Sequence, residues 1–95
     1  MTTEEMFVRI YKALAHPVRL KIVRTLLNGP LCVCVLNESV EFSQSNLSQH
    51  LRILREAGIL RSEKDRIKII YSVGDSRVKK LLNVTEEIIK NQLLT

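Results

Sequence analysis

Two cysteines separated by one residue are the strongest candidates for chemistry in this sequence. Cys32 and Cys34 flank Val33 and are the only cysteines among its 95 residues. Thiolates are soft ligands, which favours arsenite, antimonite, cadmium, lead, zinc or copper(I) over magnesium or calcium. Two cysteines this close cannot form the disulfide framework of a secreted mini-protein, so we expect reduced thiols. Three roles stay open for them: binding of a soft metal or metalloid, thiol oxidation, and plain packing in the core.

The spacing of this pair sets a geometric condition on metal binding. Residues i and i+2 point about 200° apart around an α-helix, so the sulfurs of Cys32 and Cys34 could hold one ion only where the start of a helix unwinds. A disulfide within a helix at this spacing would be strained, which ranks oxidation below metal binding. Two sulfurs also leave a metal site incomplete. Solvent, an exogenous thiol or a group from a second chain would have to complete it.

A second set of candidate residues lies on the polar face of a predicted helix. Leu47, Leu51 and Leu54 recur at helical spacing after Ser43, which has the form of an N-cap. Serine and asparagine weaken a helix, so their presence on its outer face needs a reason. Short side chains that donate and accept hydrogen bonds suit base edges, and an arginine can reach phosphate. The candidate DNA-contacting residues of this helix are Gln44, Ser45, Asn46, Ser48, Gln49 and Arg52.

A charged β-hairpin is predicted to follow this helix, which ends at Ala57-Gly58. The residues from Ile67 to Val73 alternate as a strand does, and the polar residues 63–66 form the expected tip. From position 52 to position 68 there are six basic and three acidic residues, so this stretch carries 6 − 3 = +3 of the total charge of +5. The basic side chains of the hairpin expected to meet DNA are Lys64, Arg66 and Lys68.

The other predicted elements lie before the polar helix and after the charged hairpin. An amphipathic helix is predicted from Thr3 to Leu14, and a second helix begins at Pro17 and ends at the Asn28-Gly29-Pro30 stop signal. Residues 31–40 are apolar and ambiguous between a buried strand and a short helix. A long helix capped by Asp75 closes the chain. We expect one domain over residues 1–95, mainly α with a β-hairpin wing (α+β), in the order α-α-α-α-β-β-α of a winged helix-turn-helix.

Composition excludes several classes of function. A net charge of +5 and a pI near 9.6 predict attraction to polyanions such as nucleic acid. No apolar run approaches the roughly 20 residues of a membrane span, and the N-terminus is polar, so we expect a cytoplasmic protein with no membrane partner. With two histidines, no glycine-rich phosphate loop and no carboxylate pair, an enzyme is not expected.

Three stretches of the chain resemble the ArsR/SmtB family of winged-helix repressors. They are residues 14–22 (LAHPVRLKI), 43–51 (SQSNLSQHL) and 54–60 (LREAGIL). The resemblance implies a homodimer built from the first and last helices and bound to double-stranded operator DNA. It places Gln44, Ser45, Ser48 and Gln49 in the major groove of the DNA and the hairpin beside the DNA backbone. It also places residues 31–40 in the first of the two helices of the DNA-reading helix-turn-helix motif, whose second helix, the reading helix, carries Ser48 and Gln49.

The resemblance also implies an inducer site. Several family members carry Cys-Val-Cys at the start of this same helix as ligands for soft metals or metalloids, so Cys32 and Cys34 are the expected ligands, and binding would release DNA. The chain departs from the family in having Val35 and Asn37 where an acidic residue and a third cysteine can stand. It also lacks the zinc site of the last helix and the glycine common at the hairpin tip.

The two histidines admit other readings. His16 lies at a predicted helix junction between Ala15 and Pro17, which matches a structural position of the ArsR/SmtB family, so the resemblance favours a structural role over metal ligation. His50 lies on the reading helix beside Leu47 and Leu54, where a phosphate contact and partial burial are equally compatible with the sequence.

Overall fold

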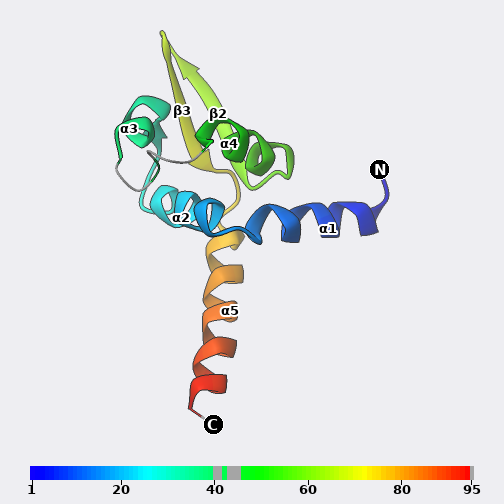
Figure 1. The fold of residues 1–95 in the computed structure, drawn as a ribbon. Helices are drawn as coiled ribbons and strands as arrows, with labels where there is room; N and C mark the ends of the chain where they lie inside the picture. Colours follow the sequence, from blue (N-terminus) through cyan, green and yellow to red (C-terminus); the bar gives the residue numbers. More distant parts are fainter. Residues whose placement is uncertain (40–41, 43–45, 95) are drawn as a thin grey trace.

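A helical body with a protruding β-hairpin confirms the expected winged helix-turn-helix (Figure 1). The computed structural model describes residues 1–39, 42 and 46–94. The predicted order of elements is confirmed, with one addition, the two-residue strand β1. The elements are α1 (Thr3–Leu14), α2 (Pro17–Leu26), β1 (Leu31–Cys32), α3 (Val33–Glu38), α4 (Leu47–Glu56), β2 (Leu60–Asp65), β3 (Lys68–Val73) and α5 (Arg77–Leu93).

Local capping explains where the first two helices begin. The backbone N–H of Glu5 donates to Thr2 Oγ1 at 3.1 Å, which caps α1 as predicted. The backbone N–H of Val18 donates to His16 Nδ1 at 3.1 Å, and Pro17 occupies the first turn of α2. A proline tolerates that position because its missing N–H would have no partner inside the helix. His16 therefore has the structural role that the sequence favoured.

The ambiguous segment before the reading helix contains both alternatives. Leu31 and Cys32 pair with β3 as β1, and α3 follows directly from Val33. The reading helix α4 begins at Leu47 with Asn46 at the N-cap position, so the predicted N-cap at Ser43 is wrong as the start of this helix. Ser43, Gln44 and Ser45 lie outside the described residues.

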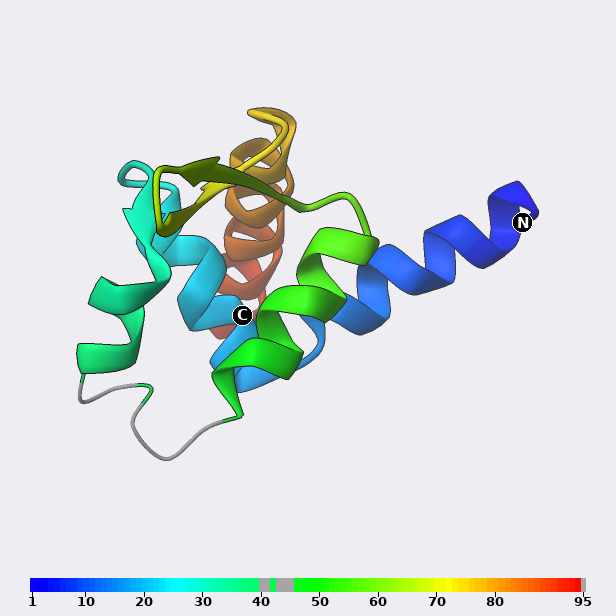
Figure 2. The ribbon, with the colours of Figure 1, turned by 90° about the horizontal axis from the view of Figure 1, so that it is seen from above.

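One hydrophobic core joins the helices to the base of the hairpin. α4 contributes Leu47, Leu51 and Leu54, as their spacing predicted. The buried face of α2 packs against this core (Figure 2). The buried residues of the core are Ala13, Leu14, Ile22, Val23, Leu26, Leu36, Phe42, Leu47, Leu51, Leu54, Ile59, Leu60 and Tyr71.

The hairpin turns two residues later than its polar sequence indicated. Asp65 is paired with Lys68, so Arg66 and Ile67 alone form the turn and the predicted tip at residues 63–66 is displaced. The three strands are ordered β1-β3-β2 and are antiparallel. Arg66 adopts a φ of 60°, a left-handed conformation that glycine adopts more readily.

The first and last helices extend away from the body in different directions (Figures 1 and 2). No residue of α5 is buried. The backbone N–H of Arg77 donates to Asp75 Oδ1 at 2.9 Å, so Asp75 caps the helix as predicted, although Ser76 is the residue at the N-cap position. Within the described part of the chain, none of the helices is both long enough and apolar enough to cross a membrane.

Candidate nucleic-acid interface

The outer face of α4 presents short polar side chains over a buried leucine stripe. Asn46, Ser48, Gln49 and Arg52 are exposed. Asn46 Nδ2 donates to Gln49 Oε1 at 2.8 Å, so these two amides are held together at the start of the helix. This bond uses the oxygen of Gln49 and one N–H of Asn46, so it does not involve the Nε2 donors of Gln49 or the side-chain oxygen of Asn46, which are groups of the kind that pair with base edges. Gln44 and Ser45, predicted for the same face, lie outside the described residues.

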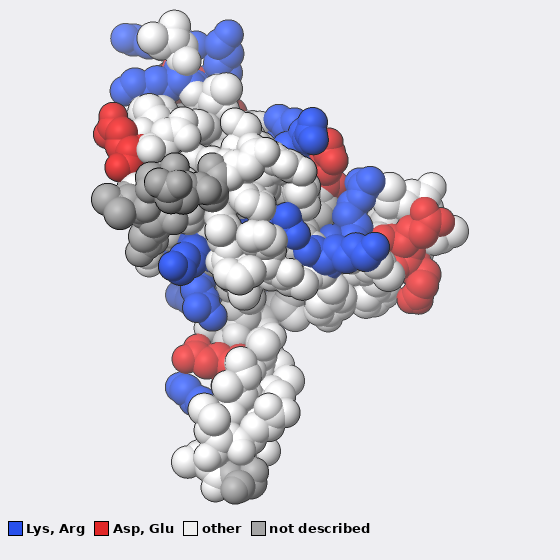
Figure 3. Space-filling view, viewed as in Figure 1, with Lys and Arg blue, Asp and Glu red and all other residues white. Residues whose placement is uncertain are grey.

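The hairpin adds positive charge at a second place. Lys64, Arg66 and Lys68 are exposed, and within the described chain none of them forms an ion pair. Figure 3 shows Lys and Arg side chains gathered at the outer end of the hairpin, with uncharged atoms between them. Part of the positive charge predicted for residues 52–68 therefore lies at the outer end of the hairpin.

Arg19 connects three helices beneath the reading surface. Its Nε donates to the carbonyl oxygen of Ala13 at 2.7 Å and its Nη2 to that of Lys12 at 3.1 Å, which satisfies carbonyls at the end of α1. Its Nη1 lies 3.3 Å from His50 Nδ1 on α4. Arg19 therefore fixes α4 relative to α1 and α2.

Sequence reasoning assigned Arg19 no role. A signal was present, because Arg19 precedes the buried Ile22 and Val23 by three and four residues and so shares their face of α2. An arginine on an apolar helix face needs partners for its guanidinium.

His50 is partly buried, which settles one of the alternatives that its sequence position left open. Its ring lies 4.5 Å from the His16 ring, centroid to centroid, with the planes tilted by 47°. Burial lowers the pKa of His50, and the positive charges of His16 and Arg19 lower it further. The neutral imidazole is the form that can accept a hydrogen bond from Arg19 at Nδ1.

The cysteine pair lies at the junction of β1 and α3. Cys32 has an extended backbone, with φ of −67° and ψ of 143°, and is the N-cap residue of α3. The backbone N–H of Cys34 donates to Cys32 Sγ at 3.2 Å, and the two sulfurs form a disulfide. Because Cys32 is not helical, the chain is already extended where α3 begins, which is the condition that the sequence set for the two sulfurs to lie on one side. The expectation of reduced thiols is wrong for this structure, because a disulfide joins the N-cap residue Cys32 to Cys34 in the first turn of α3.

The exposure of the pair also corrects the packing interpretation. Cys34 is exposed, Cys32 is half-buried, and neither belongs to the hydrophobic core. In the described part of the chain, no group of three or more His, Cys, Asp or Glu side chains could hold a metal ion. In the disulfide the two sulfurs are not thiolate ligands; reduction of the disulfide would give two adjacent thiolates, which suit a thiophilic ion with further ligands from elsewhere.

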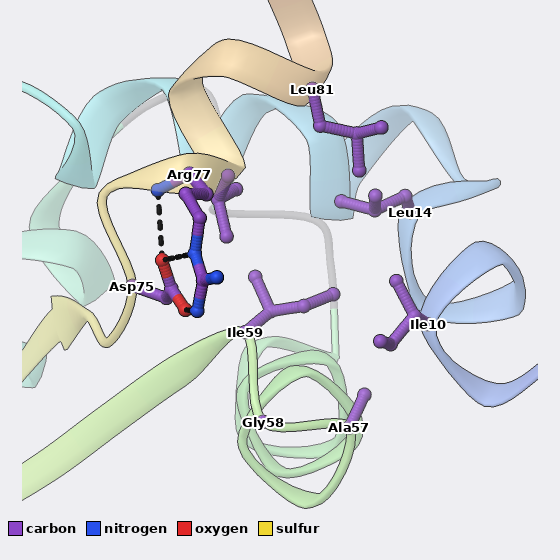
Figure 4. Close-up of a pocket in the computed structure, with 9 residues that line it drawn as sticks. Ile10, Leu14, Ala57, Gly58, Ile59, Asp75, Arg77 and Leu81 are labelled. Atoms are coloured by element: carbon purple, nitrogen blue, oxygen red, sulfur yellow. Dashed lines mark hydrogen bonds and ion pairs between the residues drawn. The ribbon is translucent and has the colours of Figure 1, made fainter. Parts of the chain in front are cut away.

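An apolar cavity of about 190 Å³ lies where α1, the end of α4 and the start of α5 meet (Figure 4). Ile10 and Leu14 of α1 face Leu81 of α5 across it. At its edge, Arg77 Nη2 and Asp75 Oδ2 form an ion pair at 2.7 Å. Hydrogen bonds from Arg77 lower the pKa of Asp75 to about 2. This cavity lies between α1 and the start of α5.

Comparison with known proteins identifies the family. Residues 16–62 match the family described as bacterial regulatory protein, arsR family. The biofilm growth-associated repressor of Xylella fastidiosa is 35% identical over 98 residues, which cover 97% of this chain and 86% of that protein. A cadmium resistance transcriptional regulatory protein CadC homolog of Staphylococcus aureus is 39% identical over 75 residues, covering 78% of this chain and 62% of that one.

A solved structure extends the similarity to nearly the whole fold. The crystal structure of Mycobacterium tuberculosis Rv0081 superimposes with a TM-score of 0.83 at 31% identity, covering 98% of this chain and 94% of the other. The relatives are transcriptional regulators, which confirms the expectation that the chain is not an enzyme. With its helix-turn-helix and wing, this chain belongs to the ArsR family of DNA-binding transcriptional repressors.

Proposed function

We propose that this repressor binds operator DNA as a homodimer, with α4 of each subunit in a major groove, and that Cys32 and Cys34 form its inducer site. The single observation that carries the DNA-reading part is the exposed face of α4. Asn46, Ser48, Gln49 and Arg52 stand outward on a helix fixed from below by buried leucines. Amide side chains can read adenine in two hydrogen bonds, and Arg52 reaches toward phosphate.

Dimerisation through α1 and α5 is supported by their uncovered apolar side chains. Eight large hydrophobic residues on these two helices are at least 45% exposed in the single chain. A symmetric partner is the usual cover for such a surface, and twofold symmetry would then place half-sites about one or two helical turns apart. The residues concerned are Met6, Phe7, Val8, Tyr11, Val84, Ile88, Ile89 and Leu93.

The position of the cysteines supports a coupling to DNA binding. Cys32 ends β1, which pairs with the wing strand β3, and it also caps α3, which precedes the reading helix. Binding of an ion by the two sulfurs, or their oxidation, therefore acts on both the wing and the helix-turn-helix, which are the elements that approach DNA. The cadmium resistance regulator among the relatives supports a soft metal or metalloid as the inducer. Coupling energies between two such sites are typically about 1–3 kcal/mol.

The disulfide favours thiol oxidation as a second candidate signal. In this case the thiols of Cys32 and Cys34 lose two protons and two electrons as the sulfur–sulfur bond forms. A peroxide as oxidant accepts both electrons and both protons, and hydrogen peroxide yields two water molecules.

The DNA-reading proposal is tested by selection from a randomised duplex library. The reduced protein is expected to enrich a sequence with twofold symmetry and to bind it at least about 1000-fold more tightly than a scrambled duplex. Its affinity should fall steeply with salt, because basic side chains release counterions from the phosphates. Equal affinity for the enriched and scrambled duplexes would reject sequence-specific repression.

The inducer proposal is tested on the same duplex by fluorescence anisotropy. Cadmium, arsenite and hydrogen peroxide are added in separate arms to the fully reduced protein, and thiolate absorption is followed in the ultraviolet. We expect release by cadmium or arsenite in the wild type and none in the Cys32→Ser/Cys34→Ser variant. Release by peroxide alone would assign the pair to thiol oxidation. Unchanged DNA affinity in all three arms would exclude an inducer site at the cysteines.

A further inference from the structure

The hairpin ends in a large apolar side chain that the described chain leaves uncovered. Ile67 is 93% exposed, the highest value among the exposed large hydrophobic residues of the described part, and Ile69 is 47% exposed. Single exposed isoleucines are common on protein surfaces. This one, however, stands in a two-residue turn at the end of a protruding arm, directly between Arg66 and Lys68.

The backbone of the turn indicates that its side chains are needed there. Arg66 has a φ of 60°, which costs a residue with a Cβ roughly 1 kcal/mol that glycine would not lose. The turn thus has an arginine beside Ile67 although glycine at this position would have a lower conformational energy.

The strand register places basic side chains on both faces of the hairpin near this tip. Lys64 lies opposite Ile69, and alternation along the strands puts both on the face that includes Leu60 and Tyr71. The acidic residues at positions 63 and 65 fall on the other face together with Lys68, which lies opposite Asp65. One face of the tip is consequently apolar and basic, which suits the sugars and phosphates of a nucleic-acid groove.

The length of the arm matches a neighbouring groove. Six residues at about 3.3 Å each give β2 and β3 a reach of roughly 20 Å. Half a turn of duplex DNA is about 17 Å, so a tip held beside α4 in the major groove meets the adjacent minor groove. That groove is about 6 Å wide and admits the turn, whereas the whole two-stranded arm needs more space.

We propose that Ile67 is an apolar wedge that enters the minor groove flanking the α4 site, opens one base step and bends the operator. This inference rests on the proposed DNA-reading function. Arg66 and Lys68 contact the sugar-phosphate edges on either side, and Ile69 follows Ile67 toward the groove. Apolar wedges work best at pyrimidine–purine steps, which unstack most easily, so the wedge adds a preference for such a step at a position that α4 does not touch.

The test uses the duplex that the wild-type protein selects from the randomised library, with a fluorophore at each end and 2-aminopurine at the flanking step. Wild type and Ile67→Leu are expected to shorten the end-to-end distance and raise 2-aminopurine fluorescence. Ile67→Ser is expected to lose both signals and to bind roughly tenfold more weakly, because its contact with the groove is no longer apolar. Thermal melting of each variant confirms equal folding, which is expected for a side chain exposed at a turn.

Equal bending by Ile67→Ser and wild type would overturn the wedge. Failure of the proposed function gives a different result, because the wild-type protein would then enrich no sequence at all. In that event the tip has no operator to bend and the wedge is rejected together with the function.

Discussion

Cys32 lies opposite Ile70 where β1 pairs with the wing strand β3. The same cysteine caps α3 and accepts a hydrogen bond from Cys34. A single residue thus joins the candidate inducer site, the wing and the first helix of the reading motif.

This pairing predicts that Ile70→Ala weakens the response to an inducer. The shorter side chain loosens the contact between β1 and β3, so a change at the sulfurs acts less on the wing. We expect the ratio of DNA affinities with and without arsenite to fall by about threefold or more, from a coupling of about 1–3 kcal/mol. Ile69→Ala is the control, since Ile69 does not face Cys32 and any direct effect on DNA cancels in the ratio. An equal change in both variants would argue against coupling through this pair.

Arg19 is predicted to stabilise the packing of three helices. Arg19→Met removes the donor to the carbonyl oxygen of Ala13, leaves that of Lys12 with the Ala15 N–H alone, and removes the contact with His50, so the free energy of unfolding should fall by about 1–3 kcal/mol. Urea denaturation measures this. The matched control is Arg24→Met, an exposed arginine of the same helix, which should change stability by less than about 0.5 kcal/mol. A similar loss in both variants would contradict the bridging role.

The lowered pKa of His50 predicts a pH dependence of stability. A histidine whose pKa is depressed in the folded state binds fewer protons there than in the unfolded chain, so its contribution is complete above the unfolded value of about 6.5 and is lost as pH falls through the folded value. Melting temperatures measured from pH 8 to pH 5 should therefore decrease. In His50→Gln this part of the decrease should disappear. A wild-type profile that rises toward pH 5 would contradict the assignment.

Arg66→Gly is predicted to separate stability from DNA binding. Glycine relaxes the φ of 60° and should raise the free energy of unfolding by roughly 0.5–1 kcal/mol, while loss of the guanidinium weakens binding to any duplex. Arg66→Ala provides the comparison, because it loses the same charge without the backbone relief. The account is wrong about this turn if alanine stabilises the fold as much as glycine does.

A charge on the exposed face of α5 is predicted to produce monomers. Ile88→Asp places a carboxylate in the apolar surface that a second subunit would cover. Sedimentation equilibrium should show a dimer for wild type and for Asn91→Asp, a polar position on the same helix, and a monomer for Ile88→Asp. A dimer that persists in Ile88→Asp would exclude this helix from the interface.

Local signals made parts of this fold predictable from sequence. The bounds of α1 follow from Thr2 as a cap and from the apolar spacing, both of which act within a few residues. The leucines of α4 were predicted from periodicity for the same reason. The start of α4 was not, because Ser43 and Asn46 are equally good capping residues by type, and α4 begins after Asn46 without a capping hydrogen bond from its side chain.

Long-range contacts account for what the sequence could not predict. The bond between Arg19 and His50 spans 31 positions and depends on how α2 crosses α4. The turn at Arg66 carries no turn-forming residue, so the register of β2 with β3 sets its place. The sulfurs of Cys32 and Cys34 meet because pairing of β1 with β3 keeps Cys32 extended, an effect absent from helical spacing alone.

The most direct test of the account is whether α4 reads sequence. Ser48→Ala/Gln49→Ala removes two exposed polar side chains and leaves the buried leucines in place. Fluorescence anisotropy on the selected duplex and on a scrambled duplex of equal length gives the ratio of the two affinities. We predict that this ratio falls by about 10-fold or more in the variant, with the affinity for scrambled DNA and the oligomeric state unchanged. A ratio equal to that of wild type would show that sequence is read elsewhere.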